Sequence, residues 1–176
     1  MNSPQDERIP RELVDIVDEN DVVQRVVTRR EMRSQRLRHR AVFIAVIDEA
    51  GRLLVHRRSP LKDVWPDWCD IAIGGVVGTG EDYLTAAYRE VQEEIGINDV
   101  VINEVDNGVI QIYDDEVVSL LGRCYFIRHS GPFTFADGEV VDAWWSTRAE
   151  FEILREREQF LPDSQTLLLP LLTLWR

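Results

Sequence analysis

The sequence is poor in cysteine, in long apolar runs and in positive charge. Its two cysteines, Cys69 and Cys124, form no Cys-x-x-Cys pair, so we expect neither a disulfide framework nor a zinc cluster. A formal net charge of −12 argues against binding to a nucleic-acid polymer or to an anionic membrane, because both need a basic face. No apolar run approaches the roughly twenty residues that a membrane span requires.

What the sequence does contain is the composition of one folded domain. Of its 176 residues, 44% are hydrophobic and 30% are charged, which is enough for a single core. We expect residues 1–10, which are polar and lack an apolar signal core, to form a flexible tail, and residues 11–176 to form one domain. The unpaired cysteines predict a reducing, cytoplasmic setting.

Apolar periodicity predicts a mixture of strands and helices. We expect a strand pair about a polar turn in residues 12–29, a short basic helix or linker, and a hairpin in residues 41–58. The remaining expected elements are long strands at 100–114 and 116–129, a strand at 140–146, and closing helices in 147–160 and 163–175. Because no βαβ unit repeats, this order predicts an α/β protein with a mixed sheet between helices.

Residues 74–97, GGVVGTGEDYLTAAYREVQEEIGI, combine a glycine-rich turn with a predicted helix. We expect the helix to begin near Glu81 or Asp82 and to end before Gly96. Glycines ahead of a helix let the chain turn sharply and let a ligand approach the backbone.

Glu90, Glu93 and Glu94 share one stripe of this helix. Like charges three and four residues apart destabilise an isolated helix by roughly 0.2–0.5 kcal/mol each. A hard divalent cation, Mg²⁺ or Mn²⁺, would neutralise them and could also hold substrate phosphates. A solvated acidic face is the alternative for such a run, but the preceding glycines and the neighbouring Arg89 favour the cation.

From Gly75 to Ile97, with Glu81 and the run 89–97 at set spacing, the sequence resembles a complete Nudix box. The resemblance implies a Nudix fold, an α/β/α sandwich around a mixed β-sheet, here with an extra N-terminal strand pair. It also implies hydrolysis of a nucleoside diphosphate linked to another moiety, with Mg²⁺ or Mn²⁺ as the cofactor.

Carried onto this sequence, the resemblance implies metal ligation by three glutamates and a backbone carbonyl of the glycine turn. These ligands are Glu90, Glu93, Glu94 and Gly74 or Gly75. Arg89 is implied as the residue that orients the glutamates, with Glu81 as its partner. Glu90 is implied either as a ligand or as the base that takes a proton from water.

Candidate residues outside the box are less specific. Glu139, just before a predicted strand, is either the catalytic base or an ordinary turn residue. Arg57 and Arg58 end a predicted strand, where they either grip a phosphate or stay solvated. Trp65 either forms a wall for a flat group or packs in the core. Further phosphate candidates, with less support, are Arg38, Arg40 and Lys62.

A weaker likeness, across residues 14–68, is to the isopentenyl-diphosphate-isomerase-like branch of the same superfamily. It makes an isomerase the alternative function. The isomerase pattern needs a cysteine and a metal-binding histidine near the first glycines, where this sequence has Ile73, Gly74 and Gly75. Cys69 lies four residues too early, and His39 matches one isomerase histidine whose partners are missing. A non-catalytic binding module is a third hypothesis, but such modules usually lose a box glutamate.

We expect the partner to be a small phosphoanhydride whose identity the sequence does not specify. The apolar stretch at residues 167–175 needs burial, either in the core or against a second subunit. A homodimer is therefore one of two alternatives that the sequence allows.

Overall fold

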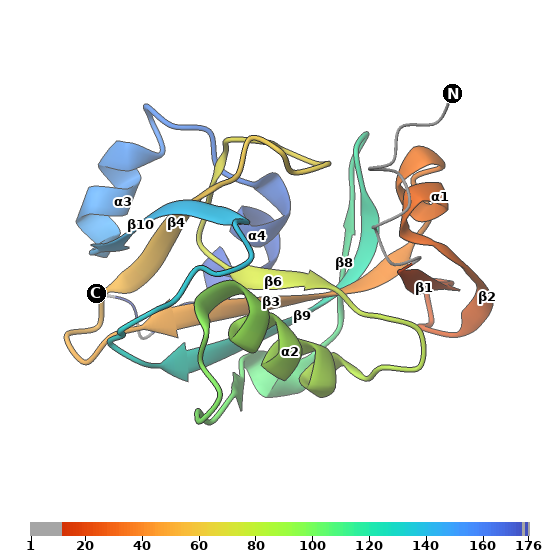
Figure 1. The fold of residues 1–176 in the computed structure, drawn as a ribbon, viewed down its shortest axis with the longest axis horizontal. Helices are drawn as coiled ribbons and strands as arrows, with labels where there is room; N and C mark the ends of the chain where they lie inside the picture. The colour runs from red at the N-terminus through yellow and green to blue at the C-terminus, as the bar shows by residue number, and fades with distance from the viewer. Residues whose placement is uncertain (1–11, 174, 176) are drawn as a thin grey trace.

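The computed structural model describes residues 12–173 and 175, and the predicted tail at residues 1–10 lies outside this range. Strands β1–β10 form a single sheet, with helices on both of its faces (Figure 1). Within the described range, no helix has both the length and the apolarity needed to cross a membrane.

The central strand β3 (His39–Ile47) organises the sheet. It pairs antiparallel with β6 (Ile73–Val76) and parallel with β9 (Ser119–Arg128), so the sheet is mixed as predicted. Alternate residues of a strand point to opposite faces. Accordingly, Phe43 and Ala45 belong to one buried core, and Ile44 and Val46 belong to another. This double burial explains why β3 reads as a continuous apolar run.

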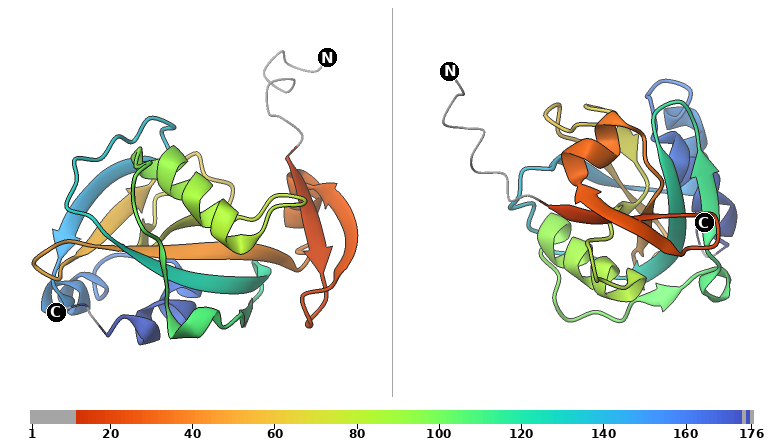
Figure 2. Two further views of the ribbon diagram at one scale, coloured as in Figure 1. Left: turned by 90° about the horizontal axis from the view of Figure 1, so that it is seen from below. Right: turned by 90° about the vertical axis from the view of Figure 1, so that its right-hand side faces the viewer.

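The two cores are covered by different helices (Figure 2). Helix α2 (Tyr83–Ile95) packs on one face through an apolar stripe that includes Ala87 and Val91. Helices α3 (Arg148–Leu154) and α4 (Pro162–Leu167), with a 3₁₀ turn at Leu169–Leu171, cover the other. This is the predicted α/β/α arrangement. The apolar C-terminal stretch is buried within its own chain, through Leu167, Leu168, Leu172 and Trp175.

The predicted hairpin at residues 41–58 is only partly correct. Strand β4 (Leu53–Arg58) pairs with β3 at one position, Ile47 with Leu53. Beyond it the strands separate, and β4 pairs with β5 (Cys69–Asp70) and β10 (Val140–Ser146) instead. This separation matters for function, because residues of β3, β4 and β6 together line a cavity.

The extra N-terminal strand pair is present. Strands β1 (Leu13–Val17) and β2 (Val23–Thr28) form an antiparallel hairpin that joins the sheet through Ile16 and His39. Helix α1 (Arg29–Ser34) follows directly, and the Thr28 hydroxyl caps it by accepting from the Glu31 N–H. The basic stretch that follows the hairpin is thus helical at its start.

Three predicted elements are wrong in length, one of them the closing helix expected across 163–175, which ends at Leu167. The expected strand at 100–114 is broken into β7 (Asn103–Glu104), a 3₁₀ turn at Asp106–Gly108 and β8 (Gln111–Asp114). Asp106 and Asn107 both have φ of 53°, a left-handed conformation that Asp and Asn tolerate better than most residues. The helix expected across 147–160 ends at Leu154.

Helix α2 begins and ends where its capping residues predict. The Asp82 side chain accepts from the Thr85 N–H at 2.7 Å, and Gly96 ends the helix with φ of 72°. A Cβ on Gly96 would lie 3.0 Å from the Cβ of Thr134.

We predict that Gly96→Ala lowers the free energy of unfolding by about 1–2 kcal/mol, because alanine is strained at this φ and also crowds Thr134. The control is Gly80→Ala, which has φ of 73° but nothing within 4 Å of the new Cβ. Urea denaturation of both variants should show the larger loss for Gly96→Ala. Equal stability of that variant and the native protein would contradict the prediction.

Candidate active site

The three glutamates of α2 differ sharply in exposure. Glu90 and Glu94 are 8% and 3% exposed, whereas Glu93 is exposed. The helix turns Glu90 and Glu94 toward the sheet because they adjoin the apolar stripe of Val91 and Ile95. Two of the three carboxylates are therefore largely withdrawn from water, which excludes a simple solvated face.

Gly74 and Gly75 are required by close packing on both sides of β6. A Cβ on Gly74 would lie 1.9 Å from the carbonyl oxygen of Val42 on β3. A Cβ on Gly75 would lie 2.5 Å from Oε1 of Glu90. The carboxylate of Glu90 thus rests directly against the glycine backbone, and any larger residue would displace it.

Arg89 links the acidic side chains of the box. Its guanidinium donates to both oxygens of Glu81, each at 2.9 Å, to Oε1 of Glu90 at 2.6 Å and to the carbonyl oxygen of Val76 at 3.1 Å. A further bond reaches Oε2 of Glu93 at 3.3 Å. The planar fork of arginine suits this arrangement, which fixes the glutamates relative to strand β6.

Glu94 has no comparable partner. Neither of its carboxylate oxygens accepts a hydrogen bond from the described residues, although the side chain is almost fully buried. Burial raises the pKa of Glu94 well above its usual range, and Glu90 raises it further. Burial also raises the pKa of Glu90 to about 7, against the opposing effect of Arg89. The positive charge around the two carboxyls is too small to offset the free-energy cost of ionising both of them in a buried site.

This donor set fits a hard divalent cation. The oxygens are of the type that Mg²⁺ and Mn²⁺ prefer, and the orphaned carboxylate of Glu94 has charge to share. In the arrangement described, no three His, Cys, Asp or Glu side chains converge closely enough to hold a metal ion. One reason is that a guanidinium nitrogen of Arg89 bonds both Glu90 and Glu93.

An open cavity of about 620 Å³ lies in front of the box and carries basic as well as acidic groups. Arg29 of α1 and Lys62 of the β4–β5 loop line it, together with Glu139 and Glu12. The ammonium of Lys62 forms an ion pair with Oε2 of Glu139, and Arg29 bonds Glu12 at 2.9 Å. Glu139 therefore lies at the site and not at a remote turn.

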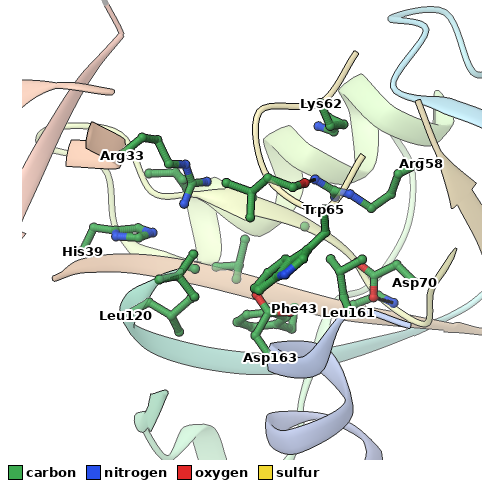
Figure 3. Close-up of a pocket in the computed structure, with 18 of the residues that line it drawn as sticks. Arg33, His39, Phe43, Arg58, Lys62, Trp65, Asp70, Leu120, Leu161 and Asp163 are labelled. Atoms are coloured by element: carbon green, nitrogen blue, oxygen red, sulfur yellow. Dashed lines mark hydrogen bonds between the residues drawn. The ribbon is translucent and has the colours of Figure 1, made fainter. Parts of the chain in front are cut away.

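A second, smaller cavity of about 70 Å³ continues from the first between β3, β4 and α4 (Figure 3). The two cavities share Arg29, Lys62 and the Gly74–Gly75 turn. Arg33 and Arg58 add two more cations to the second. A molecule with charged and apolar parts could span both cavities.

The three predicted substrate residues separate into two groups. Arg58 and Trp65 line the second cavity, but Arg57 lines neither one. The Arg57 guanidinium donates to Glu158 at 2.9 Å and to the carbonyl oxygen of Asp67 at 3.0 Å. Neighbouring residues on a strand point to opposite faces, so only one of Arg57 and Arg58 could face the cavity.

Comparison with known proteins identifies the family. The NUDIX domain model matches residues 37–165, which include the whole box. The chain belongs to the Nudix family. An uncharacterized Nudix hydrolase of Streptomyces coelicolor, SCO1686, is 49% identical over 153 residues, covering 86% of this chain and 83% of the relative. An uncharacterized Nudix hydrolase of Yersinia pestis is 40% identical over 164 residues, covering 93% of this chain and 85% of the relative.

Solved structures support the same fold. The crystal structure of DR0079 from Deinococcus radiodurans matches this chain with 24% sequence identity and a TM-score of 0.75. The match covers 91% of this chain and 99% of that one. The Nudix fold predicted from the box is thereby confirmed.

Some residues of this Nudix site were not predicted from the sequence. Arg29 and Arg33 belong to α1, outside the segment that matches the family model, and in the sequence they are distinguished only as part of a basic stretch. Asp70 and Asp163 also line the second cavity. Asp163 lies about seventy residues beyond the box in sequence, so no local pattern linked the two.

We predict that Arg89→Lys lowers the free energy of unfolding by about 2 kcal/mol or more, because lysine cannot bond Glu81 and Glu90 together. The control is Arg155→Lys, since Arg155 forms an exposed pair with Glu152 whose loss should cost under about 0.5 kcal/mol. Chemical denaturation measures both. Similar small losses for the two variants would contradict the central role of Arg89.

Proposed function

We propose that this protein is a divalent-metal-dependent hydrolase that cleaves a phosphoanhydride in a nucleoside diphosphate linked to another moiety. The observation that carries the proposal is the buried carboxylate of Glu94, which lacks a hydrogen-bond partner and adjoins Glu90. The cations lining the neighbouring cavities provide a complementary surface for phosphates. The relatives' names, Nudix hydrolases, support the same reaction type.

Mg²⁺ or Mn²⁺ would be held by Glu90, Glu93 and Glu94, with the backbone carbonyl of Gly75 as a further ligand. Such a cation neutralises the carboxylates and the substrate phosphates, and it lowers the pKa of water. Arg89 serves as a positioning residue, because its bonds to Glu81 and Val76 anchor it while it holds Glu90.

Lys62, Arg58 and Arg29 are proposed as the phosphate-binding residues. Lys62 and Arg29 are now paired with carboxylates, and phosphate oxygens can replace those partners in charge-assisted hydrogen bonds. Arg57 is omitted because Glu158 engages it away from the cavities. Trp65, at the wall of the second cavity, is proposed to contact a flat group of the substrate such as its base.

Glu139 is proposed as the general base that accepts a proton from the attacking water. It lines the same cavity as Glu90 and faces the box from outside α2. When Lys62 turns to a phosphate, the carboxylate of Glu139 becomes available for proton transfer. The remaining work is positioning and charge stabilisation, as is general for phosphoryl chemistry.

The isomerase alternative receives no support from the relatives or from the cysteines. Cys69 is fully buried on β5, and burial raises its thiol pKa to about 11, so little thiolate forms at neutral pH. It lines neither of the two cavities described above. We infer from the two free, buried cysteines that the protein works in a reducing compartment such as the cytoplasm.

We predict that Glu94→Gln abolishes Mg²⁺-dependent release of phosphate and pyrophosphate from a panel of nucleotides, because it removes the charge that the cation needs. Mn²⁺ titration followed by electron paramagnetic resonance should show weaker binding. The control is Glu152→Gln, an exposed change on α3 that should leave both readouts unaltered. Native turnover by Glu94→Gln would refute the metal assignment.

We predict that Glu139→Gln lowers kcat by about 10²-fold or more while leaving Mn²⁺ affinity close to native. The reason is that glutamine cannot accept the proton, yet the box carboxylates stay intact. Steady-state kinetics and Mn²⁺ titration on the same preparation separate the two effects. A native kcat would remove Glu139 from the mechanism.

A further inference from the structure

The second cavity contains two buried carboxyl groups that the proposed reaction does not use. Asp70 is the last residue of β5, and Asp163 lies in the first turn of α4. The two residues are 5% and 7% exposed, respectively. Figure 3 shows both among the lining residues, on the side of the cavity opposite Arg33 and Lys62. Buried carboxyls are costly unless they are paired, so their position in a cavity calls for a function.

Ser164 holds the two carboxyls side by side. Its hydroxyl donates to Oδ1 of Asp70 at 2.6 Å, and its N–H donates to Oδ1 of Asp163 at 2.7 Å. The N–H groups of Ile71 and Ala72 also donate to Oδ1 of Asp70. The second oxygen, Oδ2, of each carboxyl receives no hydrogen bond from the residues that the structure describes. Two acceptor atoms are therefore left for a ligand.

Flat and apolar surfaces lie next to these acceptors. The rings of Trp65 and Phe43 and the side chain of Leu161 line the cavity in the same region (Figure 3). Lys62 lines both cavities and so lies toward the box, near the expected position of the phosphates. Arg58 lines only this cavity, and its charge lowers the pKa of Asp70 against the effect of burial. The cavity thus has a charged end for a diphosphate and a flat end with hydrogen-bond acceptors for an aromatic heterocycle.

We propose that Asp70 and Asp163 recognise the nucleobase of the substrate by accepting hydrogen bonds from its exocyclic amino group. The inference rests on the proposed hydrolase function and adds the class of base. An amino group brings two N–H donors to a pair of acceptors, whereas a keto oxygen brings none. The enzyme therefore prefers cytosine or adenine to the keto counterparts uracil or hypoxanthine.

The size of the preference follows from the cost of an unpaired buried acceptor. A keto base would leave the carboxyl oxygens without a hydrogen-bond donor. Its own keto oxygen, which is also an acceptor, would then lie against them. Sites built to hydrogen-bond a substrate group reject analogues that lack it much more strongly than apolar pockets reject a methylene. One charged hydrogen bond corresponds to roughly tenfold or more in kcat/KM.

The test compares kcat/KM for CTP against UTP and for ATP against ITP, with Mg²⁺, at pH 8.5. This pH is chosen because burial, and Asp70 alongside, raise the pKa of Asp163 to about 7, so the Asp163 carboxyl is ionised in the assay. We expect at least one pair to show a preference of tenfold or more for the amino base. Asp163→Asn, which puts N–H donors in place of one acceptor, should reduce this ratio to below about threefold.

The matched control is Asp48→Asn. Asp48 is also a buried carboxyl, but it binds Arg52 and lies outside both cavities, so the base ratio should not change. A native protein without base preference, or an Asp163→Asn variant that keeps it, would overturn the inference. If that variant does not fold, the native ratios decide: values below threefold in both pairs overturn the proposal.

Failure of the hydrolase proposal gives a different result. In that case the native protein releases neither phosphate nor pyrophosphate from any of the four nucleotides. Calorimetric binding of CMP against UMP and of AMP against IMP then tests base recognition by itself. Tighter binding of an amino base by tenfold or more supports the role of Asp70 and Asp163, and equal or absent binding refutes it.

Discussion

The burial of two adjacent carboxylates, Glu90 and Glu94, is the constraint on which the site depends. Removing such groups from water costs several kcal/mol for each ion unless other charges offset it. Arg89 offsets part of the cost at Glu90, and the glycine at position 75 provides the space for that carboxylate. Glu94 remains without a partner in the described structure, which leaves a demand for positive charge beside the proposed phosphate-binding surface.

The remainder of the site is organised around this demand by elements distant in sequence. Separation of β3 from β4 opens the wall of a cavity, and the loop after β4 brings Lys62 to the box. Helix α1, which follows the extra strand pair, adds Arg29 and Arg33. At the other side of the cavity, α4 supplies a carboxyl next to aromatic rings. Cations thus lie near the proposed metal ligands, and acceptors lie where the rest of a substrate would extend.

Local chemistry made much of the fold predictable. The capping residues of α2, the polar turn between β1 and β2, and the apolar run of β3 each specify their own conformation. Prediction was wrong where competing local preferences or distant pairing decided. The Asp106–Gly108 turn broke a segment whose apolar content favoured a long strand. The segment 41–58 formed two strands as expected, but each found most of its partners elsewhere in the chain.

The sequence by itself determined the family and the glutamate stripe, because both depend on spacing within one helix and its preceding turn. It did not determine which glutamates are buried, which of Arg57 and Arg58 faces the cavity, or that Asp70 and Asp163 are neighbours. Those outcomes depend on how strands and helices separated by tens of residues pack against one another. Burial and side-chain direction are properties of that packing, so only the tertiary structure decided them.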